Sequence, residues 1–466
     1  MLSVLESLEH QENWLRLAAI DEILRRYKEF ELPFQESVVY FLAEKAEQDR
    51  DSLVRERAFE AMLELYEVCD EKNKSVLIRN LVEKLKKEKK PLILENAFKG
   101  LGRLFPTLES SDQQYVLAFL KSCAAGDYNY VFEENAIKVL SKLYEHLSKK
   151  EKVNLLKIFE NAAFRGYYRV QEAAIAALSQ IWPSIGKKRK LIELLNDIIE
   201  KAKDQDVKKT SVWTLASLCK GKERSRILNL LIYYTHKAKS VVVRTAALKA
   251  LVKEVYSALP KKEKETIVNL VVYLVQSAKA ADVRDSALEA LVFLLLRGEA
   301  DFNKKLLETL SALVEMDRSL HLRLGAAKSL VKLLLDERFQ EEVSFLLVDF
   351  LERDTVNEET RVVQQCTLQA IADSFCSMPN ELKGRMLDCV EKRLELVPGP
   401  SKRVFAEAFM ERFCRNGLRL SDFVAAFRLD ASYAACEIEK IGMNEIGNRA
   451  RMLVKLMEMN DNSFAI

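Results

Sequence analysis

The chain has 466 residues, of which 49% are hydrophobic, and its net charge is +3. This near-neutral balance implies neither a nucleic-acid nor a membrane partner for the chain as a whole, and the apolar runs are too short to span a bilayer. With only 13 Gly and 8 Pro there is little material for β-turns, so the composition favours an all-α protein.

The first residues, MLSVLESLEHQENW, contain no basic and apolar leader, so we expect no secretory signal there. From this point a pattern centred on a small residue recurs along the chain. At Ala247 an apolar Val243 and a basic Arg244 precede the small residue, and Leu251 follows it. Equivalent positions are Ala19, Ala58, Ala97, Ala136, Ala174, Ser211, Ala287, Ala326, Thr367 and, in looser register, Ala406. Successive positions are 36 to 41 residues apart, which indicates an internal repeat.

Each of these small residues, called anchors below, lies in a segment with apolar residues at helical spacing. A bulkier amphipathic segment precedes it, as residues 37–48 precede Ala58 across the polar link Asp49–Ser52. Ser148, with Glu151 three residues later, predicts the N-cap of one such first helix. A helix hairpin of this kind buries its apolar faces only by stacking on its neighbours. The sequence therefore predicts an α-solenoid of about eleven hairpins.

Each repeat has an apolar residue followed by a basic residue and, after two further positions, a small and an apolar residue. This pattern resembles that of the HEAT-repeat family over residues 1–416. The family commonly places an Asp in the turn within the hairpin, and Asp49 with Arg55 and Asp317 with Arg323 fit this pattern. The basic residue is missing at Leu94, Glu133, Gln171 and Gln364, so we expect any Asp–Arg ladder between repeats to be interrupted there. The resemblance implies a scaffold with partner-binding surfaces.

The residues that follow Asn416 and Gly417 lack the anchor pattern, and we expect residues 417–466 to form a short helical segment. One interpretation is a cap that covers the apolar face of the last hairpin. The other rests on RARMLVKLME, residues 449–458, which resembles part of the death-like, effector-associated adaptor modules of prokaryotic conflict systems. That resemblance implies a docking tail.

Motifs that carry catalysis or bind cofactors are missing from the sequence. The four histidines form no metal-binding motif, and there is no phosphate-binding GxxxxGK[ST] or GxGxxG loop and no GxSxG elbow. We therefore expect no enzyme activity and no cofactor. The cysteines form no CxxC pair, which is typical of core residues in a reducing, cytoplasmic compartment. They are Cys69, Cys123, Cys219, Cys366, Cys376, Cys389, Cys414 and Cys436.

Basic residues are concentrated between Pro183 and Lys264, where 20 Lys and Arg stand against 8 Asp and Glu. Four successive links between repeats contain clusters of Lys and Arg, one repeat apart. We expect these clusters to line one edge of the solenoid. They contain Lys149, Lys150 and Lys152; Lys187, Lys188, Arg189 and Lys190; Lys220, Lys222, Arg224 and Arg226; and Lys261, Lys262 and Lys264. This edge either keeps the protein soluble or binds an acidic protein or a nucleic-acid backbone.

Tyrosines occur in two turns within hairpins, GDYNY (Gly126–Tyr130) and RGYYR (Arg165–Arg169). We expect Tyr128, Tyr130, Tyr167 and Tyr168 to lie near one another, on the edge opposite the basic links. Exposed tyrosines are common in protein interfaces. The alternative is that they pack over the adjacent layer with wet hydroxyl groups.

The sequence thus predicts a non-enzymatic scaffold or adaptor that binds other proteins along a helical-repeat surface, without insertion into a membrane. The alternative is a solenoid that binds a nucleic-acid backbone along the basic links.

Overall fold

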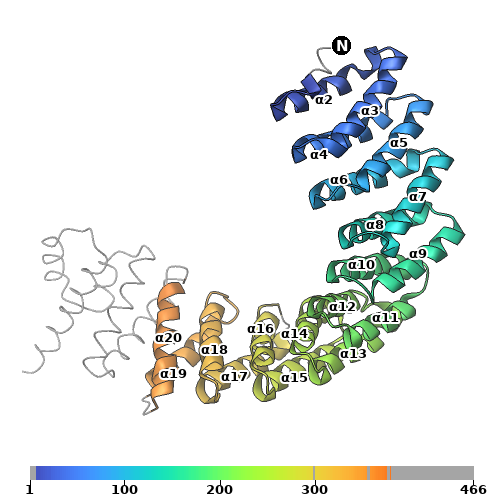
Figure 1. Cartoon of the computed structure of the whole chain (residues 1–466). Helices are drawn as coiled ribbons and strands as arrows, with labels where there is room; N and C mark the ends of the chain where they lie inside the picture. The colour runs from blue at the N-terminus through green and yellow to red at the C-terminus, as the bar shows by residue number, and fades with distance from the viewer. Residues whose placement is uncertain (1–6, 298–299, 354–356, 375–377, 379–466) are drawn as a thin grey trace, which may run out of the picture. The chain divides into compact units, whose positions relative to one another are not determined.

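The computed structural model describes residues 7–297, 300–353, 357–374 and 378 (Figure 1). The chain divides into two compact units, Met1–Asn229 and Leu230–Ile466, which we describe in turn. The last anchor, Ala406, the boundary expected between residues 416 and 417, and the segment 417–466 lie outside the described residues.

In the first unit the helices alternate between two layers. The A layer contains α3 (Leu32–Gln48), α5 (Glu71–Leu85), α7 (Ser110–Ala125), α9 (Lys149–Ala162) and α11 (Lys188–Lys201). The B layer contains α2 (Asn13–Arg26), α4 (Ser52–Tyr66), α6 (Pro91–Leu104), α8 (Tyr130–Leu143), α10 (Tyr168–Ser184) and α12 (Gln205–Ser217). Each B helix packs on the next one along the chain (Figure 1). Helix α13 (Arg224–Lys237) contains the boundary between the units.

The second unit repeats the alternation. Its A helices are α15 (Lys261–Ser277), α17 (Ala300–Met316) and α19 (Gln340–Glu352). Its B helices are α14 (Val241–Ala250), α16 (Ala281–Arg297), α18 (Leu320–Leu333) and α20 (Glu358–Ser374). Helix α14 continues into a π-helical turn, Leu251–Val255, and then into a 3-10 turn, Tyr256–Ala258. No strand occurs in the ranges that the structure describes.

The anchors hold the layers together, as the repeat pattern predicts. All ten anchors within the described residues lie in B helices and are at most 4% exposed. A small side chain at this position lets neighbouring helix axes approach closely. The predicted N-cap is also present, since the backbone N–H of Glu151 donates to the hydroxyl of Ser148 over 3.3 Å. The prediction of an α-solenoid of helix hairpins is confirmed.

Ion pairs link successive repeats through the basic position of the pattern. Arg16 donates to both carboxylate oxygens of Asp49, over 2.8 and 2.9 Å, and both side chains are almost fully buried. In the second unit Arg284 also pairs with Asp317 of the next repeat, but through one guanidinium nitrogen, since its Nε donates to the backbone carbonyl of Val275. The carboxylate therefore pairs with the arginine of the preceding repeat. Arg55, in the same repeat as Asp49, donates to the backbone carbonyl of Asp49 over 2.9 Å, and Arg323 in the repeat of Asp317 donates to that of Val314 over 2.8 Å.

At Glu133, one of the positions where the ladder lacks its basic residue, the polarity of the ion pair is reversed. Glu133 stands where the first two repeats have Arg16 and Arg55, and Arg165 in the next turn lies 3.7 Å from its carboxylate. Glu133 is 7% exposed, and its Oε1 atom accepts no hydrogen bond. Burial raises the pKa of Glu133, and the charge of Arg165 opposes this shift only in part.

Candidate functional site

The outer surface of the B layer changes character from helix to helix. The residue two positions after each anchor is turned by about 200° around the helix and faces outward. In the first unit this outward row contains, from α4 to α12, Glu60, Lys99, Lys138, Ala176 and Trp213, all of them exposed or half-buried. The row thus passes from acidic through basic to uncharged side chains. The anchors beneath it stay small and buried.

A pocket of about 410 Å³ opens on this surface across α6, α8 and α10. Its volume falls within the range of roughly 300–1,000 Å³ typical of binding pockets. The lining residues are Phe98, Lys99, Gly102, Arg103, Asn135, Lys138, Val139, Ser141, Lys142, Ala173, Ala176, Ala177 and Gln180. Four of them are cationic and none is acidic. The floor is formed by the apolar residues Phe98, Val139 and Ala177, which are at most 5% exposed.

Small residues create this pocket between closely packed helices. A Cβ atom at Gly102 would lie 2.9 Å from the Cγ1 atom of Val139, so α6 and α8 approach too closely there for a side chain. On α10 the outward row has Ala176, whereas α6 and α8 have Lys99 and Lys138 at the same position. The short side chain of Ala176 leaves the α10 side of the pocket open.

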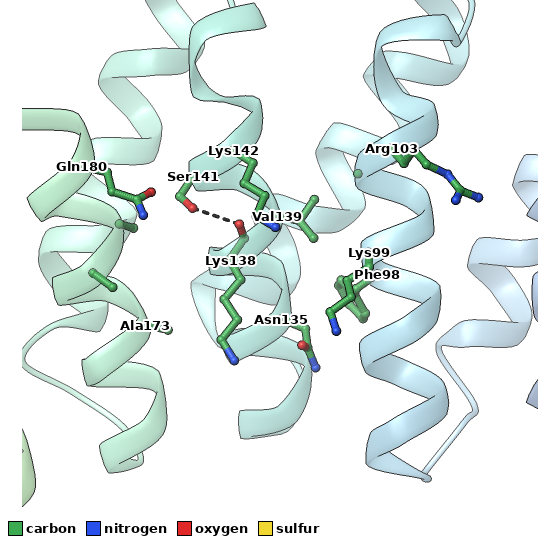
Figure 2. Close-up of a pocket in the computed structure, with 13 residues that line it drawn as sticks. Phe98, Lys99, Arg103, Asn135, Lys138, Val139, Ser141, Lys142, Ala173 and Gln180 are labelled. Carbon is green, nitrogen blue, oxygen red and sulfur yellow. Dashed lines mark hydrogen bonds between the residues drawn. The ribbon is translucent and has the colours of Figure 1, made fainter. Parts of the chain in front are cut away.

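The cations stand around the pocket on two helices (Figure 2). Lys138 and Lys142 extend from α8, and Lys99 extends from α6 towards α8, whereas the guanidinium group of Arg103 is directed away from α8. Residues four apart on a helix are separated by about 6 Å along its axis. Lys142 and Arg103 form no ion pair with any residue that the structure describes.

Two carboxylates flank the pocket and are already paired. Glu95 accepts from Lys99 over 2.7 Å, and Glu134 accepts from Lys138 over 2.6 Å. The hydrogen bond from Lys99 is the main cause that lowers the pKa of Glu95, and the charges of Lys99, Lys138 and Arg169 lower it further. Two of the four cations of the pocket are therefore paired with carboxylates, whereas Arg103 and Lys142 form no ion pair with the described residues.

The basic links lie where the sequence analysis expects them, at the starts of A helices. Lys149 and Lys150 begin α9, Lys187 is the N-cap of α11, and Lys261 begins α15. The clusters around residues 149, 187 and 220 belong to the first unit, and residues 261–264 belong to the second.

Several cations of the basic links are paired with carboxylates. Arg189 and Arg226 both pair with Glu193 over 3.5 Å, and Lys190 pairs with Glu160. In the second unit Lys261 pairs with Asp301. Within the described ranges no ion pair involves Lys149, Lys150, Lys187, Lys222 or Lys262.

The structure brings three of the four tyrosines together. The ring of Tyr167 lies 4.6 Å from the rings of both Tyr130 and Tyr168, and Tyr130 and Tyr167 are 44% and 47% exposed. Tyr128 instead stacks on Phe132 at 5.1 Å. Tyr130 and Tyr168 begin α8 and α10, so this cluster lies at the ends of the helices that carry the pocket.

No helix among the described residues has the length and hydrophobicity needed to cross a membrane. In the same part of the chain, no three His, Cys, Asp or Glu side chains are grouped so that they could hold a metal ion. The cysteines that the structure describes, Cys69, Cys123, Cys219 and Cys366, are free thiols, and the first three are buried.

No family model matches the sequence, and no curated protein matches it. Solved structures of the karyopherin Kap121p are similar in fold. The structure bound to Nup53p has a TM-score of 0.54 and 13% sequence identity, and it covers 97% of this chain and 52% of the karyopherin chain. The structure bound to the extreme C-terminus of the protein phosphatase Cdc14p has a TM-score of 0.56, 12% identity and the same coverage.

The structure of Kap121p bound to RanGTP, with a TM-score of 0.53 and 12% identity, covers 100% of this chain and 54% of the other. The chain thus spans about half the length of these karyopherins. Karyopherins are α-solenoids of HEAT repeats. The helix hairpins described above therefore have the HEAT-type α-solenoid fold that the sequence pattern predicts.

Proposed function

We propose that this chain is a non-enzymatic scaffold that binds other proteins through the B layer of its first unit. The observation that carries the proposal is the pocket across α6, α8 and α10, which combines an apolar floor with a cationic rim. Interfaces between proteins bury an apolar centre and surround it with polar groups. The pocket offers both on helices whose positions are fixed by buried anchors.

The variation along the outward row supports the same proposal. In a stack of similar hairpins, the positions that hold the stack together are constrained by packing, whereas the outer positions are free to differ. Here Glu60, Lys99 and Ala176 occupy equivalent outer positions on three helices of one unit. Such a surface distinguishes partners by charge and shape, which is the task of a scaffold.

The second candidate is a nucleic-acid-binding solenoid that uses the basic links. Lys149, Lys150, Lys187 and Lys222 favour it, because they form no ion pair with the described residues. Glu193, which pairs with two arginines of these links, weakens it. A carboxylate on the same edge reduces the attraction for phosphate groups. In the pocket, Lys99 and Lys138 are paired with Glu95 and Glu134 in the same way, but the pocket adds an apolar floor that the basic links lack.

Site-specific photo-crosslinking distinguishes the two candidates. A photoreactive phenylalanine replaces Ala176 in the pocket in one variant and Lys187 in a basic link in another. Each full-length variant is irradiated in extract of the source cells, with and without nuclease. The first proposal predicts protein adducts at position 176 that persist after nuclease treatment. Nucleic-acid adducts at position 187, with no protein adduct at position 176, would favour the second candidate instead.

A further inference from the structure

We infer that the pocket across α6, α8 and α10 binds an acidic segment of a partner protein that inserts an apolar side chain between its carboxylates. This inference rests on the proposed function and names the chemistry of the partner. It follows from the joint placement of the cations and the apolar floor, and neither feature alone would suffice.

The cations have a regular spacing that a peptide can match. Lys138 and Lys142 are one helical turn apart on α8, at about 6 Å along the axis. Lys99 stands on the neighbouring helix α6, and packed helices are about 8–10 Å apart. Carboxylates four residues apart on a partner helix repeat at the same 6 Å spacing, to within about 1 Å. Such a helix faces Lys138 and Lys142 together, and Lys99 remains within reach of a further carboxylate.

The apolar floor favours a partner with an apolar side chain between those carboxylates. Val139 and Ala177 lie beneath the cations and are 5% and 2% exposed. Ala176 on α10 leaves one side of the pocket without a charged rim. A leucine or phenylalanine of the partner fits this space and thereby removes its own apolar surface from water. This apolar side chain of the partner thereby adds binding free energy to ion pairs that contribute little when exposed.

The same floor argues against a single-stranded nucleic acid. Proteins that bind single strands stack bases on exposed aromatic rings. The aromatic side chain that lines the pocket, Phe98, is 0% exposed and offers no face for stacking.

The test uses the full chain and short fluorescein-labelled peptides. The first peptide is helical, with glutamate at every fourth position and one leucine among the glutamates. The second has glutamine in place of glutamate, and an oligothymidylate serves as the third probe. Fluorescence anisotropy at low salt should show saturable binding of the glutamate peptide and binding at least about tenfold weaker for the glutamine peptide. If the glutamate peptide fails to bind, the inference is wrong.

Matched variants locate the binding. Lys99→Glu with Lys142→Glu should weaken the binding of the glutamate peptide by about tenfold or more. Lys149→Glu with Lys150→Glu makes the same change of charge in a basic link and should leave the affinity within about twofold. Lys138 is kept because it neutralises the buried carboxylate of Glu134. Equal losses in both double variants would show binding to net charge alone and overturn the inference.

A third variant tests the insertion of the partner's apolar side chain. Ala176→Trp fills the pocket from an exposed position without changing a charge. It should weaken the glutamate peptide by about tenfold, and unchanged affinity would contradict the role of the apolar floor. Oligothymidylate binding that is lost in the Lys99→Glu, Lys142→Glu variant would assign the pocket to nucleic acid and overturn the inference. If position 176 crosslinks to proteins but the glutamate peptide does not bind, the scaffold function stands and only the acidic partner is refuted.

Discussion

Two rows of residues on the same B helices differ in almost every respect. The anchor row is small and buried in every described repeat, from Ala19 to Thr367. The outward row, two residues later, changes from Glu60 to Lys99 to Ala176 within a single unit. Packing against two neighbouring helices constrains the first row, whereas solvent constrains the second row very little. In this solenoid the constant anchor row encodes the fold, and the varied outward row is where we propose that partners are distinguished.

We expect the largest loss of stability from a charge placed in the anchor row. Ala287 is 0% exposed. Ala287→Glu would bury a carboxylate without a partner between packed helices, so we expect it to lower the free energy of unfolding by several kcal/mol. Hydrogen exchange should increase first in α16 and its neighbours, because stability in a stack is roughly a sum over repeats. Ala287→Gly introduces no charge and serves as the control.

Arg16→Ala tests the ion-pair ladder, which is buried like the anchors but polar like the outward row. Arg16 and Asp49 form a bidentate pair in which both side chains are 4% exposed. Removing one partner of a buried pair leaves an uncompensated charge, so we expect a loss of about 3 kcal/mol. Native-state hydrogen exchange in α2 and α4 measures the change. Arg25→Ala removes an exposed pair and should have little effect.

Glu133→Gln should increase stability at neutral pH by about 1 kcal/mol, since it removes a buried charge that lacks a hydrogen bond at Oε1. The pKa of Glu133 is raised in the folded state, so its ionisation weakens folding as the pH rises above the ordinary value for glutamate. Chemical denaturation of both proteins across the acid range measures this. The difference should vanish below about pH 4, where the carboxyl group is protonated in both states.

Glu134→Gln is the matched control for that experiment. Glu134 is as buried as Glu133, but it pairs with Lys138 over 2.6 Å and with Arg169 over 3.1 Å. Its replacement should therefore lower stability at neutral pH. If both variants change stability in the same direction, the reversed polarity of the ladder at Glu133 has no energetic consequence.

Glu289→Ala should produce the smallest effect, at most about 0.5 kcal/mol. Glu289 lies two residues after the anchor Ala287, with its side chain 64% exposed, and pairs with Lys249 over 2.7 Å. The thermal midpoint of the variant measures the change. A loss as large as that of Ala287→Glu would show that the two rows are assigned to the wrong faces.

The sequence predicts most of this fold because one packing rule is repeated. An apolar residue, a small residue and a leucine at fixed helical spacing place Ala58, Ala136 and Ala247 in the core with no other information. The reversed ion pair of Glu133 and Arg165 is not predictable in the same way. It depends on which side chain of one turn reaches the helix of the preceding repeat, and the spacing pattern does not specify this.

The sequence analysis does not predict the pocket, and the reason is physical. The basic links were found because their lysines are adjacent in the chain, whereas the cations of the pocket are distributed over two helices. Lys99 and Lys138 are 39 residues apart, which is the repeat length. Comparing the residues two positions after each anchor would have revealed this cationic row. The cavity depends in addition on side-chain packing around Gly102 and Val139, which no linear pattern contains.

The π-helical turn at Leu251–Val255 shows how a repeat array absorbs changes in length. Ala247 and Ala287, which flank it, are 40 residues apart, one more than the commonest spacing of 39. A wide turn holds one additional residue inside a helix without breaking it. An insertion during evolution therefore need not be confined to a surface loop. It can be stored within a helix as a wide turn, which takes up the additional residue while the side chains that follow keep the faces they had.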